Sequence, residues 1–572
     1  MIPTGKPGNH FPYNATYKNT SAGELLTLKI KTQMKKLPYI LLLLLSLSVV
    51  NVGLSGQNAG NLARSIPELE GVSSAGIVDF LNAIDTGRQE IHSFMFIRHG
   101  KVIAEGWWDP YGPDLRHLLY SASKTFAATG VGLAVSENRL KLTDKVISFF
   151  PYSLPDSIGK NMKELTVRDL LTMSVGQDPA GMGGGSNDDW ITTFIKNEPV
   201  HKPGTVFLYN NMATFMLSAI VQQVTGQTLF DYLKPRIFDP LSIRGIDWDK
   251  NPQGINLGMI GLRLHTEDMA KFGQLLMQNG KWNNKQLIPE AWVKEATSFK
   301  IDSSDPSNKM PKDKNDWAQG YCYQMWRGRN NSVRLDGMAG QFVILFPDKD
   351  AIVVLTANAR NTQEELNLVH NYLVPAIKSA KAIPSDPPKY AELQKKQSSL
   401  VIKSPVSAAE GSVFETKISG KEFLLQDNDY HIQSVYLTFK NKELSFAIKR
   451  DNQISVLKAG SDAWKTVNTK STSVLAPPRS SQSKSIDANY AVLQPVIKVA
   501  SCYSWNDPKT LEITSRFVEE SLGSQSVVCT FSEVNGTIAI TLGPKSMPGM
   551  MGGPGMPQPP AVQLRGVLVN PE

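Results

Sequence analysis

The stretch LYSASKTFAATGVGLAV, residues 119–135, decides the fold and the chemistry expected of this chain. Apolar residues recur at helical spacing between Lys124 and Leu140, which predicts a helix with a buried face. Ser121 and Lys124 stand at its start in the order S-x-x-K. Residues three positions apart share one face of a helix, so the serine hydroxyl and the lysine amine can meet there.

Such a pair suits nucleophilic catalysis. A serine hydroxyl is a poor nucleophile until a base removes its proton, and a lysine can do so when burial or a nearby cation lowers its pKa. Backbone N–H groups at a helix start can also stabilise an oxyanion. The pattern alone is not specific, because it recurs at three other places: Ser157/Lys160, Ser455/Lys458 and Ser481/Lys484. Only Ser121 opens an apolar helix, so its position singles it out.

A second motif, Tyr209-Asn210-Asn211, lies before another helical pattern that runs to Val224 and is followed by Gly226. A tyrosine close to the lysine can pass a proton to a leaving group, and Asn211 can hydrogen-bond the acyl side of a substrate. The alternative is a β-turn with a helix N-cap at Asn210 or Asn211.

Four segments in order extend these two motifs into a family resemblance. Residues from about Phe94 to Asn358 resemble the class C β-lactamase-like serine hydrolases, which include D-alanyl-D-alanine peptidases, esterases and hydrolases of aminohexanoate oligomers. The resemblance implies an α/β (α+β) fold, with an antiparallel sheet flanked by helices and a helical subdomain. The four segments are LYSASKTFAATGVGLAV (119–135), LTVRDLLTMSVG (165–176), KPGTVFLYNN (202–211) and GLRLHTEDMAKFGQLLMQNGKW (261–282).

By that resemblance Ser121 is acylated and Asn211 orients the substrate. Lys124 and Tyr209 share proton transfer, and which of them is the base stays open. The implied enzyme is a serine hydrolase of esterase or amidase type.

The family's third motif, K-T-G or H-x-G, is where the sequence departs, because DGMAGQ occupies residues 336–341. Its glycines suit a backbone that approaches a ligand closely, so an N–H near Gly340 and Gln341 is expected to complete the oxyanion hole. The cation that would grip a carboxylate is missing. Arg334 is a possible substitute, although an exposed arginine in a turn is favoured. Efficient β-lactam hydrolysis is therefore not expected.

The chain is too long for one core, so two folded domains are expected. Two hairpin patterns, Phe94–Trp107 and Gln341–Asn358, predict strands of the first domain, which we place at 61–384. A proline-bearing, charged segment, 385–396, is predicted to be a linker. Residues 397–572 alternate in short β-rich runs and predict a separate all-β domain, sandwich or barrel, with a mobile loop at 544–560.

The N-terminus is typical of export. Residues 34–57 combine two lysines, an apolar run and small residues, the layout of a secretory signal peptide. An uncleaved membrane anchor is the alternative, and residues 1–33 resemble an upstream extension without structure. The protein is expected in the periplasm or outside the cell. Of the net charge of +8, residues 1–57 supply +5, from six lysines and one glutamate, so the remaining +3 does not favour nucleic acid as a partner.

Other residue types add little chemistry. The three cysteines form no zinc pattern, and no metal or organic cofactor is implied. Cys502 and Cys529 are predicted either to pair or to remain buried thiols, and Cys322 to be a small core residue. The segment 187–190 is either a cleft edge that shapes specificity or a flexible loop. His117 and His265 are expected to be structural.

Two further functions stay open. One is a D-alanyl-D-alanine peptidase or a weak β-lactamase, whose substrate is peptide-like. The other is an envelope-associated binding protein, in which the hydrolase fold has weak chemistry and the β-rich domain contacts the cell envelope.

Overall fold

The computed structural model describes residues 60–569, apart from 88, 181–188, 409–410, 452, 462, 470–473, 476–496, 520–523 and 546–562. The predicted signal peptide and upstream extension lie outside the described residues, as does nearly all of the predicted mobile loop at 544–560. No helix of the described part is long and apolar enough to cross a membrane.

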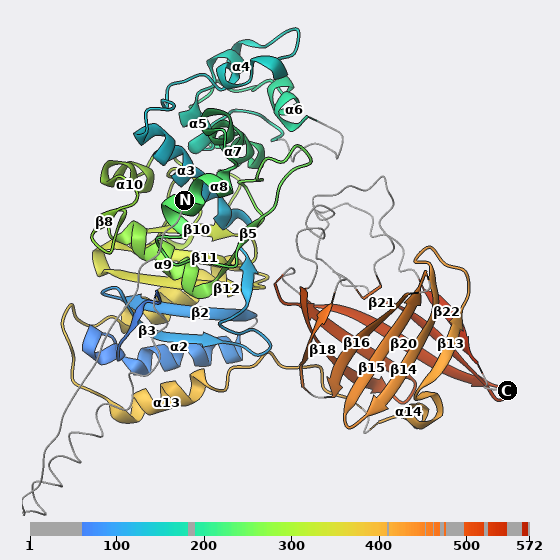
Figure 1. Ribbon diagram of the computed structural model, residues 1–572. Coiled ribbons are helices and arrows are strands. Elements are labelled where there is room, and N and C mark those ends of the chain that lie inside the picture. The colour runs from blue at the N-terminus through green and yellow to red at the C-terminus, as the bar shows by residue number, and fades with distance from the viewer. Residues whose placement is uncertain are drawn as a thin grey trace, which may run out of the picture. The chain divides into compact units, whose positions relative to one another are not determined.

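A seven-stranded sheet forms the centre of the first domain (Figure 1). Its order is β1-β3-β2-β12-β11-β10-β9, and every pairing is antiparallel except that of β1 with β3. Both predicted hairpins are confirmed, as β2–β3 and β11–β12. The strands are β1 (Ala63–Arg64), β2 (Ile91–Arg98), β3 (Lys101–Trp107), β9 (Trp326–Gly328), β10 (Ser332–Gly337), β11 (Gln341–Phe346) and β12 (Ala351–Ala357).

The sheet is buried on both faces, since side chains that point to opposite sides pack into two different hydrophobic cores. On β2, Met95 and Ile97 belong to one core, whereas Phe94 and Phe96 belong to another. Helix α9 packs on β12, β11 and β2. On the opposite side in Figure 1 lies α2. The helices nearest the sheet are α2 (Ser74–Thr86), α9 (Thr266–Met277), α11 (Thr362–Leu368) and α12 (Val374–Ala376).

A helical subdomain is inserted between β3 and β9, and it holds the two predicted functional motifs. Its central pair is α3 (Lys124–Ser136) and α7 (Asn211–Thr225), which pack against each other. Gly226 ends α7 in the left-handed region at φ 70°, as its position predicts. The other elements are α4 (Lys160–Glu164), α5 (Val167–Leu171), α6 (Trp190–Lys196), α8 (Leu229–Leu233), α10 (Glu290–Thr297) and the short strands β4 (Arg116–Leu118), β5 (Asp247–Trp248), β6 (Leu262–His265), β7 (Lys281–Trp282) and β8 (Lys285–Gln286).

The C-terminal domain is a β-barrel, which confirms the separate all-β domain. Its ten strands follow the order β16-β15-β14-β13-β22-β21-β20-β19-β18-β17, and a pairing of β16 with β18 closes the sheet. Helix α14 (Val413–Ile418) precedes the first strand. The strands are β13 (Lys421–Leu425), β14 (Ile432–Lys440), β15 (Glu443–Arg450), β16 (Gln453–Ser461), β17 (Lys465–Thr469), β18 (Ile497–Asp507), β19 (Thr510–Phe517), β20 (Gln525–Val534), β21 (Thr537–Pro544) and β22 (Leu564–Leu568).

The predicted linker is in fact a helix, α13 (Pro387–Gln397), which packs on α2 and β3 of the hydrolase domain. Its N-cap Asp386 accepts a hydrogen bond from the Lys389 N–H at 3.1 Å, and prolines occupy the first two helical positions. Leu393 is completely buried. The prolines mark a helix start here, where they are well tolerated. The segment is therefore helical, and the domain boundary placed in it stays a prediction.

The cysteines are buried thiols. Cys502 and Cys529 lie in the barrel as two reduced side chains. Cys322 is a core residue, as expected, and its Sγ donates to the Thr297 carbonyl at 3.2 Å.

Candidate active site

Ser121 lies in a 3₁₀ turn, Tyr120–Ser123, directly before α3. The helix itself begins at Lys124, where the apolar pattern begins, and it ends at Ser136, before Leu140. Residues i and i+3 eclipse each other in a 3₁₀ turn, so the expected meeting of hydroxyl and amine is preserved. Tyr120 is held at φ 48°, a conformation unusual for a residue with a side chain, and it sharpens the turn.

The amine of Lys124 is the centre of a buried hydrogen-bond network. Its Nζ lies 3.1 Å from Ser121 Oγ, 2.8 Å from Asn211 Oδ1 and 3.0 Å from the Met259 carbonyl oxygen. The residue is only 1% exposed. Burial therefore lowers the pKa of Lys124 to about 7, although the charge of Asp336 acts in the opposite direction. The neutral amine is therefore accessible near neutral pH.

Tyr209 and Asn211 approach this network from the start of α7. The Lys124 Nζ lies 5.0 Å from the centroid of the Tyr209 ring. Burial raises the pKa of Tyr209 well above its usual range, and a hydrogen bond with Ser121 only partly offsets this. Asn210 supplies the N-cap, since its Oδ1 accepts from the Ala213 N–H at 3.1 Å. Asn211 is thus left to bind the lysine.

Trp326 and its aromatic neighbours form a wall beside Tyr209 that the sequence did not indicate. The Trp326 ring stacks on Tyr209 with centroids 5.9 Å apart, and Phe207 meets Trp326 edge-on at 5.4 Å. Both Trp326 and Phe207 are half-buried. Because β9 lies some 120 residues along the chain from Tyr209, only the fold brings these rings together.

The third motif carries an acid on β10 in place of the family's cation. Asp336 Oδ2 accepts from Arg334 Nε at 2.9 Å. Arg334 is only 1% exposed, and its guanidinium lies 4.8 Å from the Trp317 ring. The expectation of an exposed arginine in a turn is therefore wrong: a buried carboxylate, two backbone carbonyls and an aromatic face hold Arg334 inside the sheet.

Gly340 lies in the turn between β10 and β11, and Gln341 is the first residue of β11. The Gly340 N–H donates to the Gly337 carbonyl at 3.2 Å, and Gly340 has φ 95°, where glycine is preferred. The amide of Gln341 is buried and donates to the Ala357 carbonyl at 2.6 Å. Both residues therefore form hydrogen bonds within the hairpin. Their role in an oxyanion hole remains a prediction.

Gly337, rather than Gly340, is the glycine that lies against the turn holding Ser121. A Cβ atom at position 337 would come within 2.2 Å of the Leu119 carbonyl oxygen, two residues before Ser121. Glycine at the end of β10 thus permits the strand to lie directly against the turn.

A Gly337→Ala variant is expected to push β10 and the Ser121 turn apart and to slow turnover by about 100-fold, because a shift of about 1 Å between reacting groups is enough for such a loss. Ester hydrolysis and the thermal midpoint are to be measured together. If the variant folded and turned over substrate at the normal rate, the close approach of Gly337 to the Ser121 turn would not matter for catalysis.

An Asp336→Asn variant is expected to lower the pKa of Lys124 further, because the negative charge that favours the ammonium is lost. The acidic limb of kcat/KM then moves to lower pH, on the order of half a unit. Asp313→Asn, at an exposed site, is the matched control. A limb that stays in place or moves to higher pH would refute this electrostatic coupling.

The remaining candidates are structural where they are described. His117 is buried, with Nε2 3.3 Å from Thr356 Oγ1, and His265 Nδ1 lies 2.8 Å from Asp268 Oδ2. Of the 187–190 segment, Asp189 caps α6 and Trp190 is 2% exposed against Phe215, so Trp190 is a core residue and does not line a cleft edge. Residues 187 and 188 lie outside the described part. Across the described ranges, no group of three His, Cys, Asp or Glu side chains is placed to hold a metal ion.

The sequence model of the Beta-lactamase family matches residues 85–373, which contain every site residue discussed above. This span is more than half of the chain. The protein therefore belongs to the Beta-lactamase family, and it is a serine hydrolase of that family.

The chain is similar to several known proteins. The chain is 23% identical over 288 residues to a 6-aminohexanoate-dimer hydrolase of Paenarthrobacter ureafaciens, covering 46% of this chain and 71% of that protein. Protein flp of Staphylococcus aureus (strain MW2) is 26% identical over 167 residues, which are 27% of this chain and 33% of flp. Among solved structures, a D-stereospecific amidohydrolase from Streptomyces sp. is 18% identical, with a TM-score of 0.42, over 53% of this chain and 99% of its own.

Proposed function

We propose that this protein hydrolyses esters or amides through an acyl-enzyme formed on Ser121. One observation carries the proposal: a buried lysine, Lys124, lies within hydrogen-bond distance of the Ser121 hydroxyl and has a pKa of about 7. A general base works best when its pKa lies near the working pH.

Lys124, rather than Tyr209, is the principal base in this proposal. A neutral amine has two N–H groups and one lone pair. Asn211 Oδ1 and the Met259 carbonyl are the two acceptors for the N–H groups, so the lone pair is directed to the Ser121 hydroxyl. Ser121 Oγ then attacks the carbonyl carbon while its proton passes to Lys124 Nζ.

Tyr209 acts as a proton donor rather than as a base. Its raised pKa keeps the phenol protonated at neutral pH, and it lies beside both Ser121 and Lys124. As the tetrahedral intermediate collapses, the proton on Lys124 reaches the leaving oxygen or nitrogen by way of the phenol. Water then attacks the acyl-enzyme and gives a proton to Lys124. As the bond between the acyl carbon and Ser121 Oγ breaks, Lys124 returns that proton to Ser121 Oγ, and the carboxylic acid leaves.

The substrate proposed is a small amide or ester with an apolar or aromatic acyl side. The half-buried rings of Trp326 and Phe207 offer an apolar surface beside Tyr209. The third motif offers no free cation for a substrate carboxylate, because Arg334 is bound to Asp336. One relative is named for hydrolysis of an amide, the 6-aminohexanoate dimer, which makes such linear amides worth testing first.

A substrate panel tests this function. Purified protein is assayed with short-chain p-nitrophenyl esters, 6-aminohexanoate dimer, a D-alanyl-D-alanine peptide and a chromogenic cephalosporin, and intact-mass spectrometry follows the acyl adduct. Turnover of esters or linear amides with an adduct on Ser121 is expected. No turnover and no adduct with any of the four substrates would refute the proposal.

We also propose that the protein is exported, on the pattern of residues 34–57. Cell fractionation and the mass of the mature N-terminus test this. An intact N-terminus in the cytosolic fraction would contradict export.

A further inference from the structure

The second domain holds a cavity at one end of its barrel, remote in sequence from Ser121. Its volume is about 770 Å³, a size typical of sites for small molecules. Strands β15, β16 and β17 supply most of its lining. The side chains that decide its character are Phe446, Ile448, Arg450, Gln453, Leu457 and Phe517.

The pairing of β15 with β16 arranges this lining from apolar to polar. Phe446 pairs with Leu457, Ile448 with Ser455, and Arg450 with Gln453. Alternate residues of a strand share one face, so these three pairs follow one another along the cavity. Phe446 is fully buried and Ile448 is 5% exposed, whereas Ser455 is exposed and Arg450 half-buried.

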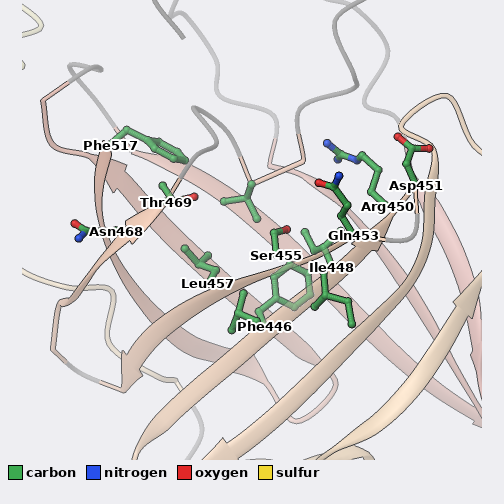
Figure 2. Close-up of a pocket in the computed structure, with 13 residues that line it drawn as sticks. Phe446, Ile448, Arg450, Asp451, Gln453, Ser455, Leu457, Asn468, Thr469 and Phe517 are labelled. Carbon is green, nitrogen blue, oxygen red and sulfur yellow. The ribbon is translucent and has the colours of Figure 1, made fainter. Parts of the chain in front are cut away.

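Figure 2 shows the same gradient in space. Phe446 and Ile448 lie at the deep end, while Arg450 and Gln453 lie near the rim beside Asp451. Four residues of extended chain separate Phe446 from Arg450, which is about 13 Å. A chain of roughly ten to twelve carbons has a comparable length.

Arg450 is the cation available at the rim. Its Nε is buried and has no hydrogen-bond partner within the described residues. Burial lowers the pKa of the Arg450 guanidinium, which the charge of Asp451 only partly offsets. The guanidinium as a whole is half-buried and lines the cavity, so a ligand carboxylate at the rim can accept charge-assisted hydrogen bonds from it.

From this geometry we infer that the barrel binds a small amphipathic anion, with its apolar body among Phe446, Ile448 and Leu457 and its carboxylate against Arg450. The site is independent of the proposed acyl-enzyme chemistry. It gives the C-terminal domain a ligand of its own.

Dodecanoate, kept below its micellar concentration, is the probe, and its binding to the full chain is measured by titration calorimetry. Arg450→Gln is expected to weaken binding at least about tenfold, because a charge-assisted hydrogen bond is lost. Ser455→Trp, which fills the cavity from its exposed side, is expected to abolish binding. Arg565→Gln, an exposed arginine of the same barrel, is the matched control and should bind normally.

Ester turnover and the thermal midpoint of each variant are measured in parallel, and both should be preserved. A Ser121→Ala protein should bind dodecanoate as well as the parent does, which separates this site from the hydrolase centre. Equal affinity of the parent and both cavity variants would overturn the inference. Loss of dodecanoate binding after covalent blocking of Ser121 would overturn it too, because binding would then belong to the active site.

Discussion

A Ser121→Ala variant is expected to lose hydrolysis by about 10³- to 10⁶-fold and to form no acyl adduct. The substitution removes only the oxygen atom that is proposed to attack the substrate. Lys124 keeps its contacts with Asn211 and the Met259 carbonyl, so the fold should be preserved. Labelling by a fluorophosphonate and turnover of a p-nitrophenyl ester are the two measurements.

Ser157→Ala is the matched control, because Ser157 belongs to the same S-x-x-K pattern but is exposed. It should retain full turnover and full labelling. If Ser121→Ala still became labelled at the parental rate, the nucleophile would have to be another residue and the proposed mechanism would fall.

Lys124→Ala is the second variant with a large expected effect. Removing a general base typically costs about 10²- to 10⁴-fold. The parental kcat/KM should rise with pH and level off above about 7, where the amine is neutral. Without the amine, hydroxide must activate Ser121, so the residual rate should keep rising with pH.

Lys124→Arg should be no better, since a guanidinium stays protonated and cannot accept the Ser121 proton. Lys160→Ala, at the exposed copy of the motif, provides the control and should behave like the parent. A Lys124→Ala profile that still levels off near pH 7 would show that another group, with a similar pKa, is the base.

Local sequence patterns predicted the elements that carry the candidate site residues. Apolar residues at helical spacing predicted α3 and α7, and two β-rich runs about a polar turn predicted the β11–β12 hairpin. Each of these patterns lies within a short stretch of neighbouring residues. The S-x-x-K and Y-x-N motifs each lie within one such element. Their positions could therefore be predicted, and the structure brings Ser121, Lys124, Tyr209 and Asn211 together as the family resemblance implied.

Contacts between distant segments could not be predicted in this way. The Met259 carbonyl that binds Lys124 lies 135 residues away along the chain. Arg334 was expected to be exposed because arginine usually is. Its burial is made tolerable by contacts with Asp336, Trp317 and two backbone carbonyls, which the fold brings together. The helix α13 was not predicted for a related reason. Its prolines are compatible with either a helix start or a linker, and composition alone does not distinguish the two.

The buried amine of Lys124 also makes the hydrolase domain less stable than it could be. An exposed lysine has a pKa of 10.5, so between pH 7 and 10.5 the unfolded chain binds a proton that the folded chain releases. The free energy of unfolding therefore rises with pH through this window. Below pH 7 both states bind the proton, so the destabilisation by Lys124 is at its full size and no longer changes with pH. The difference amounts to a few kcal/mol at neutral pH. A more thermostable variant would therefore need stabilising substitutions at other positions, since Lys124, which weakens the fold, is also the residue proposed to activate Ser121.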